Sequence, residues 1–327
     1  MIKLNACPCC LSTKLAVLRR RISKYDESFG TIEAADTNHI LENIIRKRQV
    51  RLTLLLCRQC YHVFLSPSFD QTELKRLYSG AGMKKLAAFR TRAERALGLS
   101  CPAYYCGGDE KKARRMAEQS RRFRPGFIHE TVTSLAATGI SRVIDIGGGD
   151  GQNISSFRGD GRRLFVLDMA VPHKAADGCT VLKNYEQAYR TGPFDLLVLT
   201  HTLEHIVNAH HELEIFSQLL DSPGYVYVEV PYEVCRWIVR GPRLSWHVNY
   251  FSKISLGRLF ASLGYSTILL QTRQMPYGFF RAETVVGLFT LGGTTADNSL
   301  NKTKASLPAP LAWAAEAAAW AGRKCRK

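Results

Sequence analysis

The segment VIDIGGGDG, residues 143–151, joins a short apolar run to glycines at every second position. An apolar run that stops at glycines is typical of a buried parallel strand followed by a tight turn. Glycines let backbone N–H groups approach a ligand closely, and the helix N-terminus that follows favours a negative group. A dinucleotide-binding turn has the pattern G-x-G-x-x-G, whose third glycine would stand at Gln152. Here an acid in the strand precedes glycines at alternate positions instead: Asp145, Gly147, Gly149 and Gly151.

This spelling resembles motif I of class I S-adenosylmethionine-dependent methyltransferases. In that family the loop lies against the methionine half of the cofactor, and the acid helps to hold its amino group. Residues 163–168 (RLFVLD) read as a second strand ending in Asp168, a place where a carboxylate hydrogen-bonds ribose hydroxyls. Residues 194–205 look like the family's fourth strand followed by its "LEH" segment, and residues 247–252 (HVNYFS) are similar to the run before its last hairpin.

The resemblance covers about residues 120–290 and implies S-adenosylmethionine as cofactor. The residues expected to bind it are Asp145, Gly147, Gly149, Gly151, Asp168, Asn184 and His201.

The order of strands and helices predicts an α/β fold, a doubly wound seven-stranded sheet of the Rossmann-like methyltransferase type. The last two strands lack a helix between them, which fits an antiparallel final hairpin. A small zinc-ribbon-like module precedes this fold. The predicted division is a zinc module (1–80), a basic helical connector (81–125), the cofactor-binding domain (126–291), a flexible linker (292–310) and an amphipathic basic helix (311–327).

Two C-x-x-C pairs in the first 60 residues predict a zinc site. Each pair can place two thiolates on one ion from a turn, and two pairs complete a tetrahedral site. The proposed ligands are Cys7, Cys10, Cys57 and Cys60. The 46-residue gap between the pairs exceeds the usual ribbon spacing, and it is expected to hold an extra strand or helix such as the amphipathic run 38–48. Cys9 is a spare thiol, and His39 and His62 are substitute ligands.

Residues 57–78 resemble the segment that precedes the methyltransferase domain in a bacterial subfamily. That subfamily includes sugar C-methyltransferases and members from surface-polysaccharide clusters, and the resemblance implies a structural zinc module that helps to shape the acceptor side. This sequence has Tyr61 where a glycine is common.

Methyl transfer needs the acceptor positioned in line with the donor and a base that removes a proton. The resemblance makes His247 the first candidate base, with His205 and Glu204 as the second choice. The sequence departs from the sugar C-methyltransferases at residues 244–246, where Leu, Ser and Trp replace Tyr, His and Glu. The acid/base set of keto-sugar 3-C-methylation is therefore incomplete. A structural role for His247, bonding backbone near the last hairpin, is the alternative.

The net charge of +17 is concentrated near the N-terminus, because residues 1–130 hold 25 Lys and Arg against 12 Asp and Glu. A basic surface favours anionic partners, here a small-molecule or glycan acceptor, with nucleic acid as second choice. No uncharged apolar run of 18 residues exists, so no transmembrane helix is expected. The expected location is the cytoplasm, with peripheral membrane contact through the C-terminal helix.

The sequence thus predicts a methyltransferase that acts on a sugar nucleotide, polysaccharide or lipid-linked sugar. The alternatives are an RNA methyltransferase, whose zinc module and basic half would grip phosphates, and a non-catalytic scaffold. The residues leave open the acceptor, the atom methylated and the oligomeric state.

Overall fold

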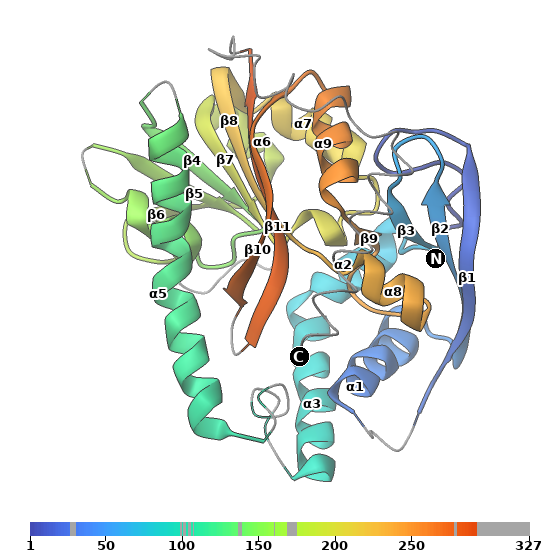
Figure 1. Ribbon diagram of the computed structural model, residues 1–327. Helices are drawn as coiled ribbons and strands as arrows, with labels where there is room; N and C mark the ends of the chain where they lie inside the picture. Colours follow the sequence, from blue (N-terminus) through green and yellow to red (C-terminus); the bar gives the residue numbers. More distant parts are fainter. Residues whose placement is uncertain are drawn as a thin grey trace.

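The computed structural model describes residues 1–26, 31–98, 100, 103, 106, 108–136, 139–159, 161–168, 175–277 and 280–292. The predicted linker 292–310, apart from its first residue, and the predicted C-terminal helix 311–327 lie outside these residues. The described chain forms a large twisted sheet with helices on both faces and a smaller sheet beside it (Figure 1).

The large sheet has seven strands in the order β10-β11-β8-β7-β4-β5-β6. Its strands are β4 (Arg142–Ile146), β5 (Arg163–Leu167), β6 (Cys179–Leu182), β7 (Phe194–Thr200), β8 (Leu220–Pro231), β10 (Ser266–Tyr277) and β11 (Phe280–Leu291). The strands β6, β5, β4, β7 and β8 pair in parallel, whereas β11 runs antiparallel to both β8 and β10. The predicted Rossmann-like fold with its final hairpin is confirmed.

Alternate residues of the central strands fill two separate cores. In β7, Leu196 and Val198 face α5 (Glu110–Leu135) and the 3-10 helix η2 (Gln152–Phe157). Leu197 and Leu199 face the opposite core. The helices on that side are α6 (Tyr185–Thr191), α7 (Ala209–Ser217) and α9 (Lys253–Ser262). This two-sided burial explains the continuous apolar runs of the parallel strands.

The small sheet is antiparallel, in the order β1-β2-β3-β9. Its strands are β1 (Leu15–Lys24), β2 (Gln49–Cys57), β3 (Val63–Ser66) and β9 (Asn249–Tyr250). The gap between the cysteine pairs therefore holds β1, the helix α1 (Ile32–His39) and a π-helical turn, η1 (Ile40–Ile44). The fourth strand comes from beyond residue 240, so the two halves of the chain share this sheet.

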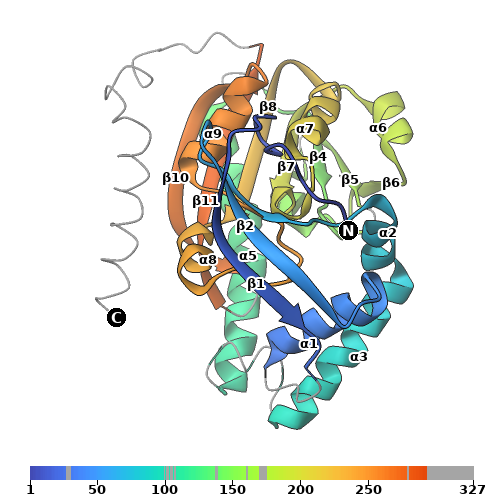
Figure 2. The same cartoon turned by 90° about the vertical axis from the view of Figure 1, so that its right-hand side faces the viewer.

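The helices that join the two sheets are α2 (Gln71–Tyr78), α3 (Gly80–Leu97) and α5, while α8 (Val234–Arg240) follows the large sheet's strand β8. Figure 2 shows β1 and β2 lying beside the large sheet, with α1 and α3 beyond one end of them. Among the residues that the structure describes, no helix is long and apolar enough to cross a bilayer.

The helix α5 runs without a break through the predicted boundary between the basic helical connector (81–125) and the cofactor-binding domain (126–291). The side chain of Asp109 caps its first turn by accepting from the Lys112 N–H at 2.9 Å. Pro125 lies inside the helix and removes one intrahelical hydrogen bond. The helix continues because Ile128 and Val132 pack into the core against the sheet. Burial of this face outweighs the local preference to break.

Candidate active site

The turn after β4 bends through three glycines in left-handed backbone conformations. Gly147, Gly149 and Gly151 have φ of +73°, +59° and +82°. A Cβ at Gly147 would lie 2.7 Å from Thr202 Oγ1, and one at Gly151 would lie 2.6 Å from Val166 Cγ2. A Cβ at Gly149 would meet nothing within 4 Å. Two glycines are therefore required by packing, and the third faces open space at the carboxyl edge of the sheet, where ligands bind.

Asp168 stands directly after β5 and is tied to this turn. Its Oδ2 accepts a hydrogen bond from the Gly149 N–H at 2.8 Å. The structure thus brings the predicted ribose-binding carboxylate and the open glycine together, because β4 and β5 are adjacent parallel strands.

Asp145 lies beneath the turn and is fully buried. Its Oδ2 is 3.5 Å from Asn153 Nδ2, and its Oδ1 has no hydrogen-bond partner among the described residues. Burial raises the pKa of Asp145 to about 7. The carboxylate presses against Gly148, where a Cβ would come within 2.1 Å of its Cγ, so a residue with a side chain at 148 would displace it.

The last two predicted cofactor residues, Asn184 and His201, are not part of the glycine turn. Asn184 is exposed and caps α6, accepting from the Gln187 N–H at 2.9 Å. His201 follows β7 with φ of +53°, and its Nδ1 lies 3.3 Å from Glu204 Oε1. Its contacts point to a polar network beside the turn, so its cofactor role and that of Asn184 stay predictions.

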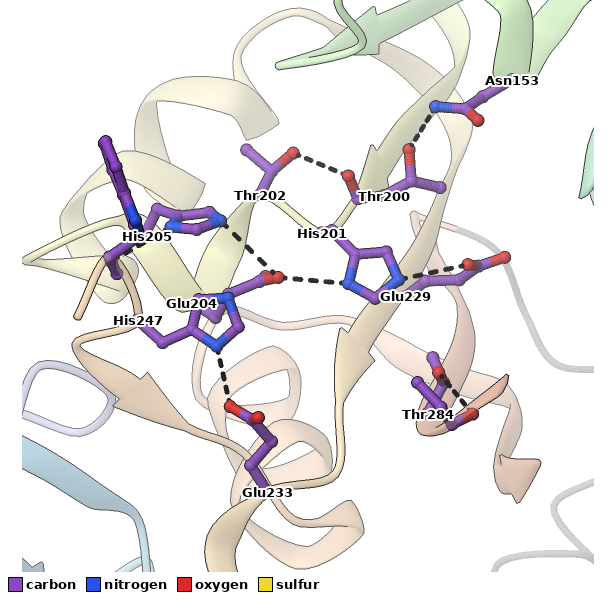
Figure 3. A network of polar contacts seen from close by, with 12 residues as sticks. Asn153, Thr200, His201, Thr202, Glu204, His205, Glu229, Glu233, His247 and Thr284 are labelled. Carbon is purple, nitrogen blue, oxygen red and sulfur yellow. Dashed lines mark hydrogen bonds and ion pairs between the residues drawn. The ribbon is translucent and has the colours of Figure 1, made fainter. Parts of the chain in front are cut away.

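The three predicted catalytic residues converge. Glu204 and His205 belong to the short helix η3 (Leu203–His205) after β7, and His247 precedes β9. Their ligand-type atoms all lie within 4.8 Å of one another, and the rings of His205 and His247 meet edge to face at 4.9 Å (Figure 3). Glu204 is 1% exposed, and neither of its carboxylate oxygens has a hydrogen-bond partner among the described residues.

Each histidine of this cluster has one ring nitrogen fixed by an acceptor. His247 Nδ1 lies 2.8 Å from Glu233 Oε2, and His205 Nδ1 lies 3.1 Å from the carbonyl oxygen of Trp246. Because a carbonyl and a carboxylate accept, both Nδ1 atoms carry the proton. Burial lowers the pKa of His205 to about 4. Burial also opposes charge on His247, but the adjacent Glu233 carboxylate outweighs it and raises the pKa of that ring.

A buried ion pair borders the cluster. Arg124 of α5 places its Nε 3.0 Å from Glu229 Oε2, near the carboxyl end of β8. The hydroxyl of Tyr227 donates to the other Glu229 oxygen at 2.7 Å. His201 Nε2 lies 3.4 Å from an Arg124 amino nitrogen, so the ion pair and the histidine form one network.

The four predicted zinc ligands also converge, between the small sheet and α7. Cys7 Sγ lies 3.5 Å from Cys60 Sγ, Cys10 Sγ lies 3.5 Å from Cys57 Sγ, and all four sulfurs fall within 4.8 Å of one another. Tetrahedral zinc at 2.3 Å from each sulfur would space the sulfurs about 3.8 Å apart. The cluster therefore fits the ion. Cys9 is buried beside it, with its N–H donating to Cys7 Sγ.

Residues 111–270 match the model of a family described as "Methyltransferase domain". This part of the chain resembles a methyltransferase domain. The predicted enzyme class, an S-adenosylmethionine-dependent methyltransferase, is confirmed. A search of curated proteins found no match.

Many solved structures resemble the chain, and three illustrate them. The 1,6-didemethyltoxoflavin-N1-methyltransferase of Burkholderia thailandensis is 15% identical over 72% of this chain and 98% of its own, with a TM-score of 0.43. The N-methyltransferase NodS of Bradyrhizobium japonicum is 14% identical over 56% and 98%, with a TM-score of 0.38. A methyltransferase of Thermotoga maritima, described as a possible histamine N-methyltransferase, is 19% identical over 52% and 91%, also at 0.38.

Three residues beside the methyltransferase domain's cluster carry no assigned role in the sequence prediction. Asn249 Oδ1 accepts from His62 Nε2–H at 3.0 Å, and its Nδ2 donates to the carbonyl oxygens of Leu203 and Ile206. Burial, with the carboxylates of Glu204 and Asp168 nearby, raises the pKa of Tyr78. Glu233 follows β8, and its bond to His247 at 2.8 Å depends on how residues 231–247 fold.

His62 and His39 do not join the four sulfurs. His62 Nε2 faces Asn249, and the His39 ring stacks on Trp246 at 6.1 Å. The four-cysteine set therefore needs no substitute ligand.

Proposed function

We propose that the chain transfers a methyl group from S-adenosylmethionine to a small-molecule or glycan acceptor. The observation that supports this most is the glycine turn itself, with an open left-handed Gly149 bonded to the carboxylate of Asp168. Glu204 and His205 follow the neighbouring strand β7 at the same edge of the sheet, and His247 joins them from the segment before β9.

The residues of the turn suit the cofactor. Gly149 leaves room where a ligand backbone or ribose would approach, and Asp145 holds a buried oxygen that lacks a partner among the described residues. When bound, S-adenosylmethionine supplies an activated methyl on a sulfonium. Asp168 would hold the ribose, and the turn would position the methionine half.

The cluster would manage the acceptor's proton. A bond forms between the acceptor atom and the methyl carbon, the sulfur–methyl bond breaks, and the acceptor releases a proton. Two ring nitrogens that carry no proton and one buried carboxylate face the same space, so this cluster can receive it.

The resemblance to sugar C-methyltransferases and the basic N-terminal half favour an anionic sugar acceptor. Glu233 supplies a carboxylate beside His247 although Trp246 replaces the glutamate of that group. An O- or N-methylated glycan fits the departures at residues 244–246 better than 3-C-methylation of a keto-sugar. The four cysteines are proposed to hold one structural zinc.

Equilibrium dialysis with S-adenosylmethionine tests the cofactor site. Wild type is expected to bind S-adenosylmethionine. Asp168→Ala should bind it at least tenfold more weakly, because it loses a charge-assisted hydrogen bond of about 1.5–3 kcal/mol. Asp221→Ala should bind like wild type, because Asp221 is exposed at the N-terminal end of β8, away from the carboxyl ends of the parallel strands. Equal weak binding by all three proteins would remove the proposal.

A screen of methyl acceptors tests the proposed acceptor class. Sugar nucleotides, lipid-linked sugars and polysaccharide fragments form one arm, and transfer RNA at two salt concentrations forms the other. Methylation of a sugar with little salt dependence is expected. RNA methylation with a steep salt dependence would promote the RNA alternative instead.

A further inference from the structure

The cluster of Glu204, His205 and His247 has the composition of a divalent-metal site. Two imidazoles and one carboxylate bind zinc and other first-row divalent ions, and three protein ligands leave a position open for a substrate oxygen. Both rings project from backbone segments that touch, because the Val248 N–H donates to the carbonyl oxygen of Glu204 at 2.8 Å.

The surroundings of the two rings are those of metal ligands. A ligating histidine donates its second ring N–H to a carboxylate or a backbone carbonyl, which fixes the ring and its tautomer. His247 does so to Glu233 and His205 does so to the carbonyl of Trp246. In each ring Nε2 is then the nitrogen with the free lone pair. Figure 3 shows the second nitrogen of His247 turned toward Glu204.

Glu204 gives the third argument. A carboxylate taken out of water is costly unless it is paired or coordinates a metal. Glu204 is 1% exposed, and the groups that face its Oε1 are two histidine rings, with His201 Nδ1 at 3.3 Å and His205 Nε2 at 3.8 Å. A cation bound between Glu204 and His205 would add to this pairing. Ligand atoms on one zinc lie about 3.4 Å apart, so the present spacing of up to 4.8 Å closes with small side-chain rotations.

We propose that Glu204, His205 and His247 bind one divalent transition-metal ion, separate from the ion of the four cysteines, and that this ion takes an oxygen of the acceptor. This role rests on the proposed methyltransferase function. The ion would lower the pKa of the coordinated hydroxyl, and because the three side chains then ligate the ion, the released proton passes to solvent water. The acceptor is then a molecule with a hydroxyl or carbonyl oxygen at or beside the methylated position.

Cobalt(II) titration of the full chain tests the site without an acceptor. The protein is first dialysed against a mild chelator and keeps zinc at its cysteines. Calorimetry is expected to give one bound Co²⁺ per chain. The absorption spectrum of the same sample should show the visible bands of cobalt bound by nitrogen and oxygen, without the intense sulfur-to-cobalt absorption. Glu204→Gln, His205→Gln and His247→Gln should abolish this uptake, and His211→Gln, an exposed histidine of α7, should not. Circular dichroism checks that each variant is folded.

Glu233→Gln keeps all three ligands and tests the positioning of His247. Loss of an outer-shell partner typically weakens metal affinity by 10- to 100-fold, and that is the expected shift. Absence of Co²⁺ uptake by wild type, uptake by the three cluster variants equal to wild type, or unchanged affinity of Glu233→Gln would each overturn the site. Dialysis with S-adenosylmethionine on the same samples separates this failure from a failure of the proposed function.

Discussion

At the scale of single residues, the glycines of the turn do different work, and substitution should separate them. Gly151→Ala adds a Cβ 2.6 Å from Val166 Cγ2 at a φ of +82°. Left-handed backbone costs about 1–2 kcal/mol and overpacking adds about 1–3 kcal/mol, so Gly151→Ala should lower the free energy of unfolding by about 3 kcal/mol. Gly149→Ala should lower the free energy of unfolding only by the cost of the left-handed backbone, because its added Cβ meets no atom within 4 Å. Urea unfolding measures both.

For cofactor affinity, the order of the two substitutions should be reversed. A methyl at Gly149 projects into open space at the predicted binding crevice, whereas Gly151 faces the strand β5. Gly149→Ala is therefore expected to weaken S-adenosylmethionine binding more than Gly151→Ala does, measured by dialysis under folding conditions. Equal effects on stability and binding would contradict this division.

His39 makes the stability depend on pH. Burial, with Lys85 and Arg90 nearby, lowers its pKa from 6.5 to about 4. Between these values the unfolded chain binds a proton that the folded chain does not, so stability is complete above pH 6.5 and falls as the pH falls. The free energy of unfolding should drop by about 2 kcal/mol more in wild type than in His39→Leu between pH 7 and pH 5.

Urea unfolding of both proteins at the two pH values measures this difference. His211→Leu, which replaces an exposed histidine, should retain the wild-type dependence. A slope in His39→Leu as steep as in wild type would show that other groups set the acid sensitivity.

The residues that the sequence could predict are those held by local pattern. The glycine turn, the acid at the end of the next strand and the four-cysteine site could be predicted, because each is recognised from a short local sequence pattern. Glu233 and Asn249 could not be assigned roles, because their partners depend on where distant segments meet. Their bonds to His247 and His62 join residues 14 and 187 positions apart.

At the scale of elements, α5 is fastened to the sheet by a buried ion pair. Arg124 has a side chain 10% exposed and Glu229 is fully buried, so Arg124→Met leaves an uncompensated charge. Breaking such a pair costs about 3–5 kcal/mol. The loss should be partly restored in the double variant with Glu229→Gln, which a double-mutant cycle of unfolding free energies measures.

Arg122 of the same helix is the matched control. It pairs with Glu118 on the surface, where its side chain is 80% exposed. Arg122→Met should change stability by less than about 0.5 kcal/mol. Similar losses for both arginines would mean that helix propensity, and not the buried pair, determines the effect.

The parallel strands at the centre of the large sheet could be predicted from sequence because each is a largely apolar run between turns. The strand β9 could not, because it has two residues and pairs with β3, more than 180 positions away. The continuity of α5 across the predicted boundary at residue 125 was also missed, because Pro125 disfavours a helix interior and tertiary burial outweighs that preference.

At the scale of the whole molecule, hydrogen bonds connect the cysteine module to the cluster of Glu204, His205 and His247. His62, two residues after Cys60, bonds Asn249, and Asn249 bonds the backbone that carries Glu204 and His205. The Leu65 N–H also donates to the Val248 carbonyl at 2.8 Å. The glycine turn is one step further away, where the Thr202 hydroxyl donates to the Ile146 carbonyl at 3.0 Å. Loss of the proposed zinc should therefore disturb the acceptor side and spare the cofactor side.

Cys57→Ser should release the zinc, because one thiolate ligand is lost from a tetrahedral set. Hydrogen exchange at the Leu65 and Val248 amides is expected to accelerate, since these groups bridge β3 to the cluster. Binding of S-adenosylmethionine should stay within about twofold of wild type, as expected for independent sites. Metal analysis, hydrogen exchange and dialysis measure the three quantities.

Cys235→Ser is the control, because Cys235 is buried in α8 and lies outside the four-sulfur cluster. It should keep its zinc and its exchange rates. If Cys57→Ser is too unstable, removal of zinc from wild type by a strong chelator, followed by its return, provides the same comparison reversibly. Slow exchange at Leu65 and Val248 in zinc-free protein would mean that the module is a passive neighbour, and that packing alone holds His247 in place.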